Sequence, residues 1–182
     1  MKLYKQIIVV ITFALIFMSH SAMASESINP YVESDPIAFM LGGYSLHSGV
    51  EKNQWRAQLG VFAANMPQDM LTNNQFELRQ SGWGIKLDYS FNQDKGWFIG
   101  TELEATQIDY RLSGSTETTS RASNLFGLRT GYRYYWTKQV FVTPWITVKR
   151  NLSDKQAVVL NNETYAIQQW IVFPTVHLGW QF

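Results

Sequence analysis

Two side chains in the first third of the chain, Ser45 and His47, have the types and spacing needed for acyl-group hydrolysis. In an extended strand they share one face, because alternate side chains point to the same side. His47 could then act as general base toward a Ser45 nucleophile, with the carboxylate of Glu51 orienting the imidazole. The Ser-x-His spacing is also common by chance. A hydrogen-bonded histidine inside a protein wall is therefore the simpler interpretation, and catalysis is the alternative.

Metal chemistry has less support than hydrolysis. Beyond the first 24 residues only two histidines, His47 and His177, remain, and the chain has no cysteine. No His-x-x-x-His or cysteine cluster supplies a ligand set. The sequence predicts neither a metal site nor a cofactor.

The segment that carries His177 has the clearest strand pattern. Counted back in twos from the end of the sequence, an apolar face alternates with a small or polar one: Phe182, Trp180, Leu178 and Val176 against Gln181, Gly179, His177 and Thr175. Such a strand is suited to lipid on one side and a barrel interior on the other.

The same two-residue rhythm recurs along the chain, in which aromatic residues make up 15%. No helical period explains it, because charges recur at every second position. Aromatic rings at strand ends are typical of membrane-interface girdles. The predicted lipid-facing girdle consists of Trp55, Trp83, Tyr89, Trp97, Tyr132, Tyr134, Trp136, Trp180 and Phe182.

The opposite faces of these strands would fill the lumen with charges of both signs. The predicted lumen charge network consists of Arg56, Lys86, Asp88, Glu102, Glu104, Arg129, Arg133, Lys149 and His177. Buried charges must pair, since an unpaired one costs several kcal/mol. Glu102 and Glu104 lie on the strand before the one with Arg129 and Arg133, which predicts ion pairs between these neighbouring strands. Eight strands leave room only for side chains, so we expect a plugged barrel.

The start of the chain indicates export. Lys2 and Lys5 precede an apolar run from Ile7 to Met18, and Ala22-Met23-Ala24 offers small residues for cleavage. We expect a signal peptide at 1–24, an N-terminal periplasmic or loop segment at 25–35, and an outer-membrane β-barrel at 36–182. Without Lys2 and Lys5, 13 basic residues remain against 14 acidic ones, and this balance gives no indication of a nucleic-acid partner.

Eight strands can be counted, but their connections raise a problem of orientation. With both termini in the periplasm, eight strands would put the tight turns outside, against the usual rule of short periplasmic turns. An extra strand before Pro36, with a hairpin around Asn161-Asn162 inside an outer loop, would restore the rule. Pro144 and Pro174 lie inside strand patterns and predict bulges or an irregular sheet. The expected strands are 37–51, 54–65, 80–92, 97–112, 122–137, 139–151, 156–160 and 163–182.

The leader, the alternating strands and the Val-His-Leu-Gly-Trp-Gln-Phe ending resemble small eight-stranded outer-membrane barrels of the OmpA-like and OmpW-like types. The resemblance implies an all-β antiparallel transmembrane barrel in the outer membrane of a Gram-negative bacterium, in contact with lipid and lipopolysaccharide. It also implies recognition by the outer-membrane assembly machinery through the C-terminal strand. A protein or a small apolar ligand at the loops is a further candidate partner.

The resemblance implies fold and location but no function; the function that we expect is structural or interaction-bearing, without enzymatic activity. One alternative is a lipid A-modifying hydrolase of the PagL type, in which Ser, His and an acidic residue lie on a barrel wall. That enzyme type works on the lipid-facing side, whereas Ser45 and His47 are expected to face inward. A second alternative is a narrow gated channel for small solutes.

Overall fold

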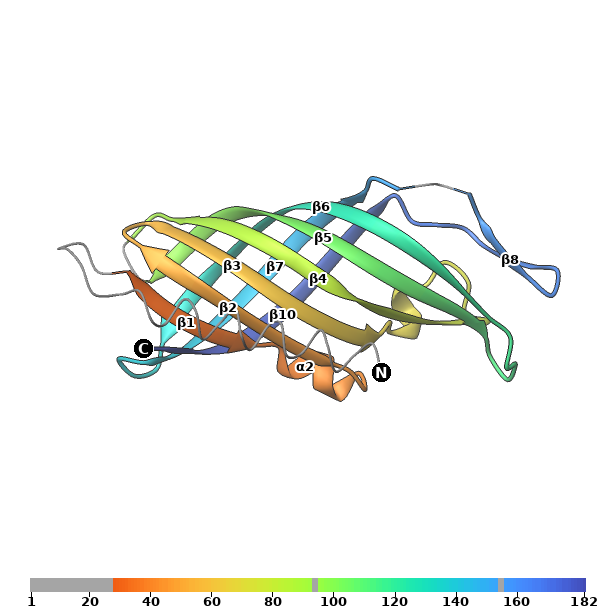
Figure 1. Cartoon of the computed structure of the whole chain (residues 1–182), viewed down its shortest axis with the longest axis horizontal. Coiled ribbons are helices and arrows are strands. Elements are labelled where there is room, and N and C mark those ends of the chain that lie inside the picture. Colours follow the sequence, from red (N-terminus) through yellow and green to blue (C-terminus); the bar gives the residue numbers. More distant parts are fainter. Residues whose placement is uncertain (1–27, 93–94, 154–155) are drawn as a thin grey trace.

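The structure is a computed structural model that describes residues 28–92, 95–153 and 156–182, so the predicted leader lies outside the described residues. Eight antiparallel strands close into a barrel in the order β1-β10-β7-β6-β5-β4-β3-β2 (Figure 1). These strands are β1 (Asn29–Ser34), β2 (Tyr44–Lys52), β3 (Trp55–Asn65), β4 (Phe76–Ser90), β5 (Gly96–Leu112), β6 (Thr118–Tyr135), β7 (Val140–Asn151) and β10 (Trp170–Gln181). The predicted fold class is confirmed.

The first strand of the barrel differs from the prediction. Residues 37–51 do not form one strand: a short helix, α2 (Pro36–Met40), precedes β2. Asp35 caps this helix by accepting a hydrogen bond from the Ile37 amide at 2.8 Å, and Pro36 occupies the first turn, where a missing N–H costs nothing. Asp35-Pro36 is therefore a helix start signal within an apolar run.

The barrel also begins earlier than the predicted boundary at residue 36. Residues 29–34, predicted to lie outside it, form β1, which pairs with β2 on one side and β10 on the other. Its short length and mixed composition hide it from pattern analysis, because only Tyr31 and Glu33 turn buried side chains inward. Closure of the barrel by β1 corrects the predicted domain boundary.

The predicted strands 156–160 and 163–182 also need correction. A separate two-stranded hairpin forms from β8 (Val158–Leu160) and β9 (Glu163–Tyr165), and the last barrel strand begins only at Trp170. Asn161 and Asn162 have φ values of 47° and 66°, as a primed hairpin turn requires. The predicted turn is confirmed, but its strands lie outside the barrel.

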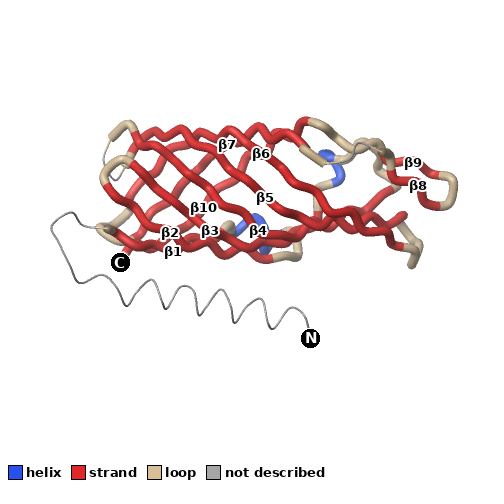
Figure 2. The backbone as a smooth tube through the Cα atoms, turned by 45° about the horizontal axis from the view of Figure 1, so that its top comes forward, coloured by secondary structure: helices blue, strands red, loops and turns tan. Residues whose placement is uncertain are grey.

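The alternative with an extra strand before Pro36 and a hairpin around Asn161-Asn162 in an outer loop is confirmed, and it removes the problem of orientation. The connections β2–β3, β4–β5 and β6–β7 are short and lie at the same end of the barrel as Asn29 and Gln181, which we call the tight-turn end (Figure 2). The connections at the opposite, long-loop end carry α2, a 3-10 turn η1 (Gln68–Met70) and the β8–β9 hairpin. No described helix has both the length and the apolarity to cross a membrane.

The two prolines sit in the sheet without bulges. The β6–β7 register is the same on both sides of Pro144, but no pairing joins Tyr132 and Arg133 to Pro144 and Thr143, since proline has no N–H to donate. The β10–β7 register is continuous through Pro174. The Phe182 amide donates to the Pro30 carbonyl of β1, so the N–H groups of even-numbered residues in β10 point away from β7. Pro174 is even-numbered, and its missing N–H therefore removes no hydrogen bond to β7.

Strand β5 shows how the polarity of the barrel changes along its length. Toward the tight-turn end its outward residues, such as Ile99 and Leu103, are exposed and apolar, while Glu102 is buried inside. Toward the long-loop end the arrangement reverses: Arg111 lies exposed on the outside and Tyr110 is buried inside. The two sections of this strand are therefore built for different surroundings.

The reversed section has its own apolar core. β4, β5 and β6 extend beyond the other strands, and the β8–β9 hairpin lies at this end of the molecule (Figure 1). The core consists of Phe76, Leu78, Tyr110, Leu112, Val158, Leu160 and Tyr165. Burial raises the pKa of Tyr110 to about 12 because the phenolate is poorly solvated there. We call this part the strand extension.

Candidate functional site in the barrel lumen

All nine side chains of the predicted lumen charge network are buried, each with 7% or less of its surface exposed. The network is connected by ion pairs between strands. Lys149 Nζ lies 2.6 Å from Glu104 Oε1 and 3.3 Å from Glu102 Oε1. Thr147 Oγ1 donates a further hydrogen bond to Glu102 at 2.7 Å.

The pairing between neighbouring strands that the sequence predicted is wrong. Glu102 lies opposite Gly127 on β6, and Arg129 lies opposite Gly100 on β5. The ion pairs reach across these glycines to the next strand: Arg129 Nε is 3.5 Å from Asp88 Oδ1 on β4. A Cβ at Gly100 would lie 2.1 Å from that same Asp88 oxygen, so the glycine leaves the space that the pair occupies.

Arg133 joins the other end of the network. Its guanidinium lies 3.1 Å from Glu51 Oε2 and 3.3 Å from Glu33 Oε2. Glu33 comes from β1, which lies before the predicted barrel boundary at residue 36, so this acidic partner was missed. The only available signal was that Tyr31 and Glu33 alternate with Val32 and Ser34 ahead of the helix.

Four aromatic rings also face the lumen, which the sequence analysis did not predict. Arg129 Cζ lies 4.1 Å above Trp145 and 5.3 Å from Phe98, and Arg133 Cζ lies 4.0 Å above Phe141 and 4.7 Å from Tyr31. Such cation–π contacts compensate part of the lost hydration of each guanidinium. Phe98 lies four residues before Glu102, and Trp145 lies four residues before Lys149. Alternation within each strand therefore places the ring on the same face as the charge.

The serine and histidine proposed for hydrolysis do meet. Ser45 Oγ lies 2.9 Å from His47 Nε2, and the rings of His47 and His177 lie with centroids 4.9 Å apart and planes tilted by 33°. His177 Nδ1 in turn lies 2.7 Å from Glu33 Oε1. The His47 ring passes over Gly60, where a Cβ would lie 1.8 Å from Nδ1.

The predicted third member of that group does not take part. Glu51 binds Arg133 and Arg56 toward the tight-turn end, and His47 Nδ1 has no hydrogen-bond partner among the described residues. The carboxylate that does reach an imidazole is that of Glu33, and it binds the other histidine. Within residues 28–92, 95–153 and 156–182, the serine–histidine pair has no orienting carboxylate.

A small cavity opens beside this pair, with a volume of about 80 Å³. Ser45, His47, Lys86, Trp145 and His177 belong to its lining. The apolar lining comes from α2, β3, β10 and the residues that directly follow α2 and β3: Ile37, Ala38, Leu41, Phe62, Met66, Ile171 and Phe173. The polar lining also includes Asp35, Asn65, Gln80 and the Glu104–Lys149 pair.

The predicted girdle residues lie on the outer surface. Tyr89 is half-buried against Trp55, with ring centroids 5.1 Å apart, and the other eight are exposed. All except Trp83 lie toward the tight-turn end, where Trp97 also packs edge-on against Tyr132. The rings therefore gather mainly at one end of the barrel. Among the described residues, no group of three or more His, Asp or Glu is placed to hold a metal ion.

Comparison with known proteins identifies the fold. No family model matches the chain, and no curated protein matches its sequence. Two solved structures superpose on most of it, with a TM-score of 0.54 in each case. Neisserial surface protein A (NspA) is 13% identical, with 87% of this chain and 100% of that chain covered. A major outer membrane protein from Thermus thermophilus is 12% identical, with 86% and 100% covered. The chain has the fold of the small eight-stranded outer-membrane β-barrels.

Proposed function

We propose that the chain is an integral outer-membrane β-barrel protein with a closed lumen and an interaction role at its long-loop end. The observation that carries this proposal is the polarity reversal along β5. A soluble barrel would bury its apolar side chains inside along its whole length. Here Leu103 is 48% exposed and Glu102 is 1% exposed, which is favourable only if lipid surrounds this part of the wall.

The position of the reversal sets the membrane boundary. The apolar outward residues run from Phe91, directly after β4, to Trp83 within it, and polar Ser81, Arg79 and Glu77 follow. Eight residue steps at about 3.4 Å each, tilted by roughly 40°, span about 20 Å, close to the apolar band of such barrels. The tight turns would then lie in the periplasm, and the strand extension would lie outside the cell.

The lumen is expected to be closed to solutes. Buried ion pairs and guanidinium–ring contacts join β1 to β7 through Glu33, Arg133 and Phe141. Opening a pore would separate these charges in a low-dielectric interior, which costs several kcal/mol for each ion. The charge network therefore supports a sealed barrel more than a gated channel.

An interaction role follows from the strand extension. Its outer surface carries charges of both signs, including Glu77, Arg79, Asp109 and Arg111 beside a surface cavity of about 480 Å³. An ordered platform outside the membrane would present these side chains to a protein partner. Recognition by the assembly machinery through β10, with lipid and lipopolysaccharide around the barrel, remains part of this proposal.

Lipid hydrolysis is a second candidate, favoured by the 2.9 Å contact between Ser45 and His47. It is the weaker one, because no carboxylate within the described part of the chain bonds His47 Nδ1 and holds its tautomer. Comparing the acyl content of outer-membrane lipid between cells with the natural protein and with His47→Ala decides between the two. Unchanged lipid removes the hydrolase.

Two measurements test the main proposal. A closed barrel in detergent should migrate faster on a denaturing gel before boiling than after it, because the folded ladder resists unfolding. Planar bilayers containing the folded protein should show no steady conductance. A protein that folds without detergent or lipid would contradict the membrane location, and stable open channels would contradict the closed lumen.

A further inference from the structure

The barrel wall has a lateral gap between β10 and β2. β1 pairs with β10 only from Leu178 to Gln181, whereas β7 pairs with β10 from Trp170 to Trp180. Among the described residues, no strand lies beside β10 from Trp170 to His177 on the side away from β7. Peptide groups that point to this side would face lipid unpaired. Pro174 points there and removes one unpaired donor.

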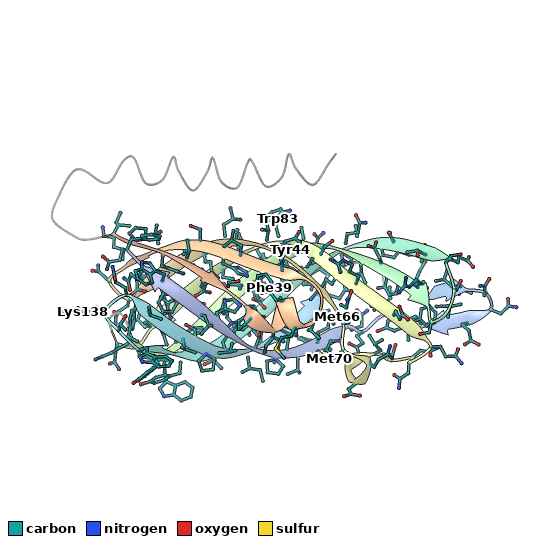
Figure 3. The ribbon with its side chains drawn as sticks, turned by 90° about the horizontal axis from the view of Figure 1, so that it is seen from below. Phe39, Tyr44, Met66, Met70, Trp83 and Lys138 are labelled. Atoms are coloured by element: carbon teal, nitrogen blue, oxygen red, sulfur yellow. The ribbon has the colours of Figure 1, made fainter. Side chains whose placement is uncertain are left out.

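Helix α2 covers part of this gap. It contacts β2, β3 and β10, and Phe39, 57% exposed, points away from the barrel (Figure 3). The helix is attached to β10 through Asp35, whose Oδ2 accepts a hydrogen bond from Thr175 Oγ1 at 2.6 Å. The Asp35 amide also donates a hydrogen bond to Ser45 Oγ at 3.3 Å. Backbone bonds from the Gly43 amide to the Ala38 carbonyl and from the Asn65 amide to the Leu41 carbonyl hold the end of the helix, but no strand ladder joins α2 to β10.

The cavity of about 80 Å³ is lined by residues of α2 and β10, the two elements that border the gap. Its apolar lining includes Ile37 and Phe173, and its polar lining includes Lys86. An entry of this kind joins an apolar surface to a buried cation.

Lys86 is the one cation of this lining without an anionic partner among the described residues. It is 6% exposed, and its Nζ lies 4.8 Å from the Trp145 ring centroid without an ion pair. Lys149, the other cation, is bound by Glu102 and Glu104. Of the acidic groups that line the cavity, Glu104 is bound by Lys149 and Asp35 by Thr175. Glu102, Glu33 and Glu104 attract this charge from beyond ion-pair distance, so a ligand anion in direct contact with the ammonium group would stabilise it further.

We propose that this cavity binds the carboxylate of a single-chain fatty acid that enters sideways from the membrane. The carboxylate pairs with Lys86 and is within reach of Ser45 and the histidine pair. The acyl chain leaves through the gap beside α2, along Phe62, Ile171 and Phe173. The small volume fits a carboxylate and its first carbons, and the rest of the chain stays in the bilayer. This inference rests on the proposed membrane location.

Photo-crosslinking tests the site in the folded protein, reconstituted in phosphatidylcholine vesicles and checked by its heat-modifiable migration. The probe is a long-chain fatty acid with a diazirine on the carbon beside its carboxyl group. We expect adducts on Phe62, Trp145 or Phe173, and about tenfold fewer with the matching fatty alcohol, because a charge-assisted contact is lost. Adducts confined to outward residues such as Leu103, or equal labelling by acid and alcohol, would overturn the proposal.

Two matched variants test whether Lys86 supplies the positive charge that binds the carboxylate. Lys86→Met should reduce acid labelling of the cavity to the level of the alcohol, whereas Lys138→Met, at the tight-turn end, should leave it unchanged (Figure 3). If Lys86→Met does not fold, the comparison of acid with alcohol on the natural chain still decides. Normal heat-modifiable migration with no cavity adducts would reject the fatty-acid site alone, whereas loss of that migration would reject the membrane barrel itself.

Discussion

Arg129 and Asp88 form an ion pair although a whole strand separates them. Their atoms lie 3.5 Å apart because Gly100, which lies between them in register, has no side chain. The same arrangement brings Glu102 to Lys149 across Gly127. Glycines facing the lumen therefore decide which charges meet.

Replacing Gly100 tests this role. In Gly100→Ala the new Cβ would lie 2.1 Å from Asp88 Oδ1 and 2.6 Å from the Leu87 carbonyl oxygen, so the pair and the strand must shift. We expect the free energy of unfolding to fall by about 1–3 kcal/mol, as for an overpacked core. Urea unfolding in detergent, followed by tryptophan fluorescence, measures it. The outward neighbour Thr101→Ala should have little effect, and equal losses for both would contradict the role of the glycine.

Removing one buried partner should be costly. Lys149→Met leaves Glu102 and Glu104 without their ammonium group, and breaking a buried pair costs about 3–5 kcal/mol. The same unfolding assay should show most of this loss recovered when both glutamates are also changed to glutamine.

Arg111→Met is the matched control for that prediction. It breaks an ion pair with Glu77 on the exposed surface of the strand extension, where solvent screens the charges. A loss in Arg111→Met as large as in Lys149→Met would contradict the assignment of lumen burial to these charges.

The strand extension should loosen at alkaline pH. The pKa of Tyr110 is raised to about 12 from an ordinary value of 10.0, so its neutral form stabilises the fold. That contribution is complete below about pH 10 and is lost as the pH rises through about 12, because the unfolded state releases the proton first. Protease cleavage in the β8–β9 hairpin should increase over this range in the natural protein and less in Tyr110→Phe. Identical pH profiles for the two proteins would exclude Tyr110 as the cause.

Sequence patterns predicted most of the barrel wall, because lipid outside and charge inside impose a strict two-residue alternation. β3, β5 and β7 lie close to their predicted limits for this reason. The alternation did not identify the elements whose length or surroundings differ from those of the long wall strands. β1 is too short to show it, α2 interrupts an apolar run, and the β8–β9 hairpin alternates like a wall strand although it lies outside the barrel.

The site was predicted less completely than the wall. Alternation identifies which side chains face inward, such as Arg129 and Lys149, because it depends on one strand only. Partners depend on the register of three adjacent strands, which no single-strand pattern contains. Glu51 was assigned to His47 for that reason, although Arg133 binds it. Glu33 was missed because β1 is short and lies before the predicted boundary, whereas alternation within β7 already placed Trp145 on the face of Lys149.

The position of the membrane boundary along β5 is tested most directly with spin labels. The chain has no cysteine, so single cysteines at Ile99, Leu103, Gln107 and Arg111 can be labelled without background in vesicle-reconstituted protein. Labels at Ile99 and Leu103 should collide mainly with oxygen, which concentrates in lipid, and labels at Gln107 and Arg111 with a water-soluble nickel complex. Equal access of the nickel complex to all four positions would contradict a lipid-facing wall.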